Sequence, residues 1–169
     1  MNFTRPAFAA LLSTVILASA PGCGDGGHGK QTAGASPPIK HEHTPPHGGT
    51  AIELGEEAFH LELVRDPEAG VLKCYVLDGH LENFIRVADL TFTINAQISG
   101  KTERLSFQAV ANPATGETAG DTSLFEARAE WLRAVARFEG ELESLTIRGT
   151  RFNSVPFKFP EGNEASPPK

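Results

Sequence analysis

The sequence predicts an all-β domain: an antiparallel two-sheet sandwich of the immunoglobulin-like type, with one short helix near residues 129–138. Apolar and polar residues alternate along short segments, which is typical of strands with one face in the core and one face in water. Turn-forming residues separate these segments at spacings of about 8 to 15 residues. Roughly seven or eight such segments fall between residues 47 and 160, a number typical of a two-sheet sandwich.

The first half of this domain is predicted to contain a hairpin. In "AFHLELVRD", residues 58–66, the alternation places His60 and Glu62 on the outward face. The turn "PEAG" separates this segment from "VLKCYVLD", and a four-residue connection between alternating segments indicates a hairpin. Cys74 falls on the inward face of the second segment, where we interpret it as a small buried hydrophobe. Further strands are expected at 50–54, 90–98 and 104–111, and residues 83–87 are expected to form a short strand or a connector.

The segment 122–138 has two interpretations. Ser123 and Glu126 match a helix capping box, and the apolar residues that follow recur at helical spacing, which favours one long helix. The alternative is a strand at 122–127 followed by a short helix at 129–138, and we adopt it. Two more strands are expected after Gly140, with a turn near Arg148.

The first 22 residues have the features of an export signal. Arg5 is their only charge, and the apolar run from Ala7 to Ala20 suits a signal peptide and is too short to span a bilayer. The stretch "SAPGC" resembles a bacterial lipobox, which implies that Cys23 is lipidated and anchors the protein to a membrane facing the periplasm. Ala18-Ser19-Ala20 fits ordinary signal cleavage, so a secreted protein is the alternative.

The regions that flank the domain are predicted to be disordered. Residues 23–46 and 161–169 are rich in Gly, Pro, Ser and Lys, so they cannot bury enough apolar surface to offset the entropy of ordering. The net charge of −6 argues against nucleic-acid binding, which needs clustered Lys and Arg. Motifs such as G-x-S-x-G and H-E-x-x-H are absent from the sequence, and we expect the protein not to be an enzyme.

The stretch "KHEHTPPHGG" is the first candidate metal site. His41 and His43 stand two residues apart, so in an extended chain their side chains point to the same side. His47 follows after two prolines. Neutral imidazole is a good ligand for Cu or Zn, so the three histidines could close on one ion. The alternative is a polar tether that happens to contain histidines.

A longer stretch that begins at His47 carries a resemblance. "PHGGTAIELGEEAFHLELVRDPEAGVLKCYVLDGHLENFIRV" resembles a small β module of bacterial envelope proteins, among them lipoproteins and the N-terminal part of heavy-metal efflux adaptor proteins. The resemblance implies a periplasmic β-sandwich and metal handling. His47 matches the His-Gly-Gly position and His60 the strand histidine. The long helical hairpin of an adaptor is absent, so an efflux role does not carry over.

A second candidate site consists of His47, His60 and His80, which could converge if the ends of the 58–78 hairpin lie near His47. The alternative for His60 and His80 is a surface side chain with a local hydrogen bond. We therefore predict an exported lipoprotein that binds or buffers a transition metal ion in the periplasm. The alternative function is a non-enzymatic module that binds another cell-envelope protein and has no dedicated metal.

Overall fold

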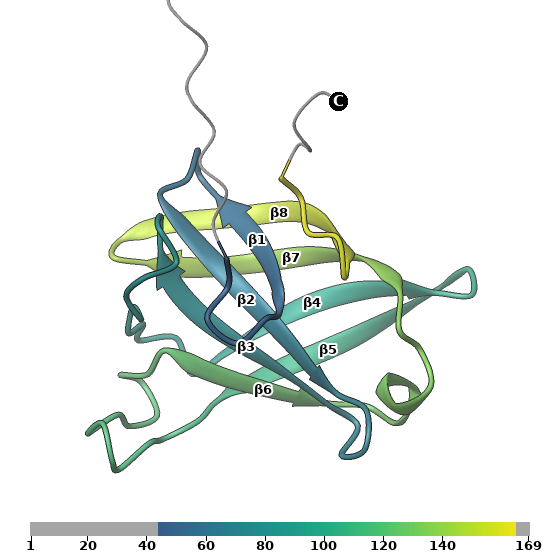
Figure 1. Ribbon diagram of the computed structural model, residues 1–169, viewed down its shortest axis with the longest axis horizontal. Helices are drawn as coiled ribbons and strands as arrows, with labels where there is room; N and C mark the ends of the chain where they lie inside the picture. The colour runs from purple at the N-terminus through teal and green to yellow at the C-terminus, as the bar shows by residue number, and fades with distance from the viewer. Residues whose placement is uncertain (1–43, 165–169) are drawn as a thin grey trace, which may run out of the picture. The chain divides into compact units, whose positions relative to one another are not determined.

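The computed structural model describes residues 44–164, which fold as an antiparallel β-structure with almost no helix (Figure 1). The prediction of an all-β antiparallel domain is confirmed. The strands are β1 (Thr50–Leu54), β2 (Phe59–Asp66), β3 (Val71–Asp78), β4 (Thr91–Ile98), β5 (Lys101–Ala109), β6 (Leu124–Arg128), β7 (Phe138–Ile147) and β8 (Thr150–Phe159).

All eight strands belong to one hydrogen-bonded sheet, in the order β1-β2-β3-β6-β5-β4-β7-β8. The two-sheet immunoglobulin-like sandwich is therefore not confirmed. The sheet curls until its edge strands β1 and β8 lie beside each other, so it is nearly closed (Figure 1). Alternation within a strand shows which residues face the core, but it does not distinguish one curled sheet from two packed sheets.

The expected helix at 129–138 is much shorter in the structure. A single 3₁₀ turn, η1 (Glu130–Arg133), follows β6, and the chain then runs into β7 at Phe138. The carbonyl of Val135, which follows this turn, accepts a hydrogen bond from the Arg65 guanidinium at 2.6 Å. The choice of a strand before this turn, rather than one long helix, is confirmed by β6. Of the two interpretations of residues 83–87, a short strand or a connector, the structure shows a connector with isolated bridges at Phe84 and Val87.

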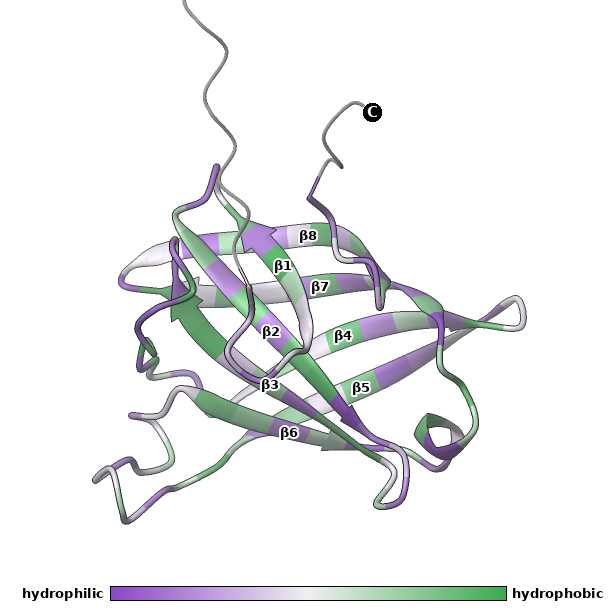
Figure 2. Ribbon diagram, in the orientation of Figure 1, coloured by the Kyte–Doolittle hydropathy of each residue, from purple (hydrophilic) through white to green (hydrophobic). Residues whose placement is uncertain are grey.

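The main core lies inside the curled sheet. Figure 2 shows apolar and polar residues alternating along β4 and β7, and the buried residues of these strands are mainly the apolar ones. The rings of Phe92 and Phe107 stack with centroids 4.8 Å apart, and Phe125 meets Phe92 edge-on at 5.0 Å. Full burial of one such side chain contributes about 1.5–3 kcal/mol.

Part of the outer face of β2 and β3 is also buried. Residues 44–49, which we call the N-terminal strap, contact Glu62 there, and the C-terminal segment reaches His60 through Glu164. Leu77 and Leu81 are buried on this side as well, outside the main core cluster. The outward position that alternation predicts for His60 and Glu62 is therefore not a solvated one: both are 0% exposed.

The seam between β1 and β8 is bridged by the segment that follows β8. The side-chain amide of Asn163 accepts from the Glu53 main-chain N–H at 2.7 Å and donates to the Glu53 carbonyl at 3.0 Å. Gly162 lies against β1, where an added Cβ would come within 2.2 Å of the Ala51 carbonyl oxygen. These contacts occupy an edge that would otherwise expose unpaired main-chain groups.

Residues 1–43 and 165–169 lie outside the described residues. They include the predicted export signal, the predicted lipidation site Cys23, and most of the two segments predicted to be disordered. Residues 44–164 contain no helix with the length and apolar character needed to cross a membrane.

Candidate functional site

A buried carboxylate on β2 organises the candidate site. Glu62 is 0% exposed. One of its oxygens, Oε1, accepts from the main-chain N–H groups of His47 at 2.7 Å and of Gly49 at 3.0 Å. The other oxygen, Oε2, lies 2.8 Å from Nδ1 of His47. Among residues 44–164, His47 is its only ion-pair partner, so three contacts to the strap replace the water that the carboxylate lost on folding.

The His47 ring is held at Nδ1 by Glu62 and on its face by Tyr75. Its plane stacks on Tyr75, with centroids 3.9 Å apart and an angle of 14° between the rings, and Phe84 lies 5.8 Å away. Tyr75 is placed there by strand register, because it stands directly opposite Glu62 in the β2–β3 ladder. The His47 side chain is 36% exposed, and its Nε2 has no hydrogen-bond partner within residues 44–164.

The two glycines after His47 are needed for this close approach. Gly48 has φ +67°, a left-handed conformation that glycine adopts without strain. At Gly49 an added Cβ would lie 2.6 Å from the Leu63 carbonyl oxygen and 2.9 Å from Cγ of Glu62. The His-Gly-Gly stretch therefore forms a turn that lies directly on β2.

The other predicted ligands are dispersed. His41 and His43 lie outside the described residues. His60 is buried, with Nδ1 3.3 Å from the Asp78 carbonyl oxygen and Nε2 3.4 Å from Oε1 of Glu164, so its interpretation as a surface side chain is wrong. His80 is exposed in the turn after β3. Within residues 44–164, no three His, Cys, Asp or Glu side chains are placed to hold one metal ion together.

The turn that carries His80 is organised by Asp78. Its carboxylate accepts the main-chain N–H groups of Glu82 at 3.0 Å and Asn83 at 3.2 Å, and the Asn83 side-chain amide at 2.6 Å. Burial raises the pKa of Asp78, but these hydrogen bonds outweigh that effect and the pKa is lowered. Asp78 thus has a structural role in this turn.

Cys74 is buried in β3, as predicted. Burial, and then the nearby charge of Glu62, raise the pKa of its thiol far above the ordinary value. The thiolate is the reactive form of cysteine, so Cys74 is a poor nucleophile and a poor metal ligand in the folded protein.

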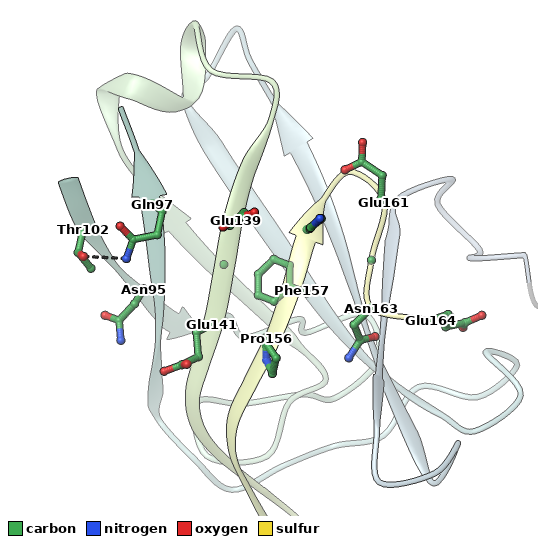
Figure 3. A pocket seen from close by; sticks show the side chains of 13 residues that line it. Asn95, Gln97, Thr102, Glu139, Glu141, Pro156, Phe157, Glu161, Asn163 and Glu164 are labelled. Carbon is green, nitrogen blue, oxygen red and sulfur yellow. Dashed lines mark hydrogen bonds between the residues drawn. The ribbon is translucent and has the colours of Figure 1, made fainter. Parts of the chain in front are cut away.

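A groove crosses the outer face of β4, β7 and β8 and has a volume of about 710 Å³ (Figure 3). Its described lining includes no histidine or cysteine, and Lys158 is its only basic residue. Glu161 pairs with Arg137 at its rim. The groove lacks the paired nucleophile and base of a hydrolytic site, so the His47 centre remains the candidate site. The acidic residues of the lining are Glu139, Glu141, Glu161 and Glu164.

No protein-family model matches the chain, and no curated protein or solved structure matches it either.

Sequence reasoning identified His47 but missed two residues that hold it, Glu62 and Tyr75. Both belong to the quoted resemblance, in "HLELV" and "YVLD". Glu62 stands on the polar side of an alternating strand, where an ordinary solvated carboxylate is expected, so no local signal marked it as buried.

Proposed function

We propose that the protein is an exported, membrane-anchored lipoprotein that binds a transition metal ion, Cu or Zn, through His47 and the histidines that precede it. The observation that carries this proposal is the contact between Nδ1 of His47 and the buried carboxylate of Glu62, at 2.8 Å. Histidines that bind metals usually donate their second ring nitrogen to a carboxylate or a carbonyl. This arrangement leaves Nε2 of His47 as the ligand atom.

The sequence supplies the remaining donors. His43 and His41 precede His47 by four and six residues, and Glu42 lies between them. Two imidazoles besides His47, with or without the carboxylate, make a donor set that suits Cu(II) or Zn(II). In this proposal His60 and His80 do not share the ion, because His60 is buried and His80 lies in a separate turn.

Anchorage is the second part of the proposal. It rests on the lipobox-like "SAPGC" and on the Gly-rich stretch behind Cys23, which suits a tether between a lipid and a domain. A lipidated Cys23 would confine the metal site to a membrane surface in the periplasm. Radiolabelled palmitate incorporation in a bacterial host tests this part. Label on the wild type that is lost in Cys23→Ser supports lipidation, and an unlabelled wild type refutes it.

Metal binding is tested by titrating the chain from Gly24 onward with Cu(II) and with Zn(II) in a calorimeter. A variant in which His41, His43 and His47 are all alanine is the first control, and His80→Ala is the second. We expect one-to-one binding that is lost in the triple variant and unchanged in His80→Ala. Equal binding by the wild type and the triple variant would refute the site.

The alternative function, a non-enzymatic module that binds another envelope protein, has one observation in its favour. Phe84 is 49% exposed beside Tyr75 and His47, and an exposed aromatic ring is a frequent anchor at interfaces. Crosslinking in envelope extracts, with Phe84→Ala as the control, tests it. Capture of the same partner by the wild type and by Phe84→Ala would show that the partner does not use this surface.

A further inference from the structure

The hydrogen-bond system of Glu62 restricts where the protons of the site can lie. Its Oε1 faces two main-chain N–H groups, those of His47 and Gly49. A main-chain amide nitrogen only donates, so Oε1 must accept from both. Two donors on one oxygen favour the ionised carboxylate, because hydrogen bonds to a charged acceptor are stronger than those to a neutral one.

An ionised carboxylate has no hydrogen to donate. The 2.8 Å contact between Oε2 of Glu62 and Nδ1 of His47 therefore requires the hydrogen to be on Nδ1. A neutral imidazole carries only one N–H, so Nε2 is then left with a free lone pair.

We propose that Glu62 is the positioning residue of the metal site: it locks His47 in the Nδ1–H tautomer, so that the Nε2 lone pair points outward as the ligand atom for a divalent transition-metal ion. The metal part of this inference rests on the proposed function. The tautomer itself does not, since it is argued from the contacts of residues 47, 49 and 62 with Glu62 ionised and His47 neutral.

Tyr75 fixes the plane of the His47 ring. The stacked contact at 3.9 Å and the Nδ1 contact to Glu62 together define both the tilt and the rotation of the His47 side chain. A ligand that is already oriented loses little side-chain entropy when it binds an ion. The site therefore presents one oriented donor on the outer face of the sheet.

Glu62→Gln separates this role from a merely structural one. The two main-chain N–H groups still require an oxygen, so the amide oxygen of the glutamine occupies the Oε1 position. The amide NH₂ group then faces Nδ1 of His47 and donates to it, which moves the ring hydrogen to Nε2. The substitution keeps the shape of the side chain and reverses the tautomer.

The tautomer is measured by long-range ¹H–¹⁵N NMR of the imidazole rings in the chain from Gly24 onward, in alkaline buffer without metal. His47→Ala identifies the His47 signals. We expect the Nδ1–H pattern in the wild type and the Nε2–H pattern in Glu62→Gln. An Nε2–H pattern in the wild type, or an unchanged tautomer in Glu62→Gln, would overturn the inference. The wild-type spectrum decides even if the variant fails to fold.

Metal affinity is measured on the same proteins by titration with Zn(II). Glu62→Gln is expected to weaken binding by roughly 10- to 100-fold, the usual effect of losing a partner that orients a metal ligand. The matched control is Glu126→Gln, which removes a partly exposed carboxylate on β6 whose charge also acts on Tyr75 but which has no contact with the His47 ring. It should change the affinity by less than about 3-fold, since exposed charges contribute little.

The two proposals can fail separately. A wild type with the Nδ1–H tautomer that binds no Zn(II) or Cu(II) refutes the proposed function and the metal role of Glu62, but leaves the tautomer lock intact. A wild type that binds metal with equal affinity in Glu62→Gln refutes the positioning role alone.

Discussion

Replacing Glu62 with alanine should release the N-terminal strap from the sheet. The side chain holds the strap through two main-chain N–H groups and one imidazole nitrogen, at 2.7, 3.0 and 2.8 Å. Hydrogen bonds to charged groups contribute about 1.5–3 kcal/mol each, so three of them set an upper limit of roughly 5–9 kcal/mol. The measured loss will be smaller, because a detached strap regains water and conformational freedom. We expect the free energy of unfolding to fall by about 2–4 kcal/mol.

Thermal melting and hydrogen exchange together check this value. For a domain of this size, 1 kcal/mol corresponds to about 4 °C, so the midpoint should fall by roughly 8–16 °C. Exchange of the Gly49 amide should become fast. The control is Glu126→Ala, which removes an exposed pair with Arg128 and should cost less than about 1 kcal/mol. A loss below about 0.5 kcal/mol in Glu62→Ala, with the Gly49 amide still protected, would refute the reasoning.

Three further predictions concern the same domain. Gly49→Ala should destabilise the domain by about 1–3 kcal/mol in chemical denaturation, because the new Cβ meets the main chain of β2. In Gly48→Ala the new Cβ has no atom within 4 Å, so the loss should be only about 1 kcal/mol, from the positive φ. Equal losses in the two variants would contradict this. Burial raises the pKa of Glu117, but hydrogen bonds from Thr115 and Ser123 and the charge of Arg86 outweigh that effect and lower the pKa. The ionised side chain therefore stabilises the fold above its unfolded pKa of 4.5, and this stabilisation is lost as the pH falls below that value. Glu117→Gln should flatten the acid side of the curve of stability against pH, and an unchanged slope would be evidence against this. Cys74 should react with a thiol reagent only as fast as the domain unfolds, and rapid labelling of the native protein would disprove its burial.

The strands were predictable because their signals are local. The side-chain period of two along β2, β4 and β7, and the turn residues between them, are properties of a few neighbouring residues. The burial of Cys74 followed from the same alternation. The helical spacing in 122–138 favoured one long helix, which the structure does not contain. The same apolar residues also fit a strand followed by a single turn, as the structure shows.

The candidate site was only half predictable. His47 was visible as part of a rare cluster of histidines. Its partners were not visible, because nothing local pairs residue 47 with a carboxylate 15 residues away or with a tyrosine on the next strand. The same limit applies to His60, whose burial depends on Glu164 at the far end of the domain.

The sequence by itself therefore determined the strand content, the inward-facing residues and the histidine that the site is built around. Tertiary structure decided that the strands close into one sheet, and that the outer face of β2 is covered by both ends of the domain. The physical reason is the distance along the chain over which these contacts act. The amide of Asn163 completes the edge of β1 at Glu53, 110 residues earlier, and the buried carboxylate of Glu62 acquires its partners only when the strap folds back across it.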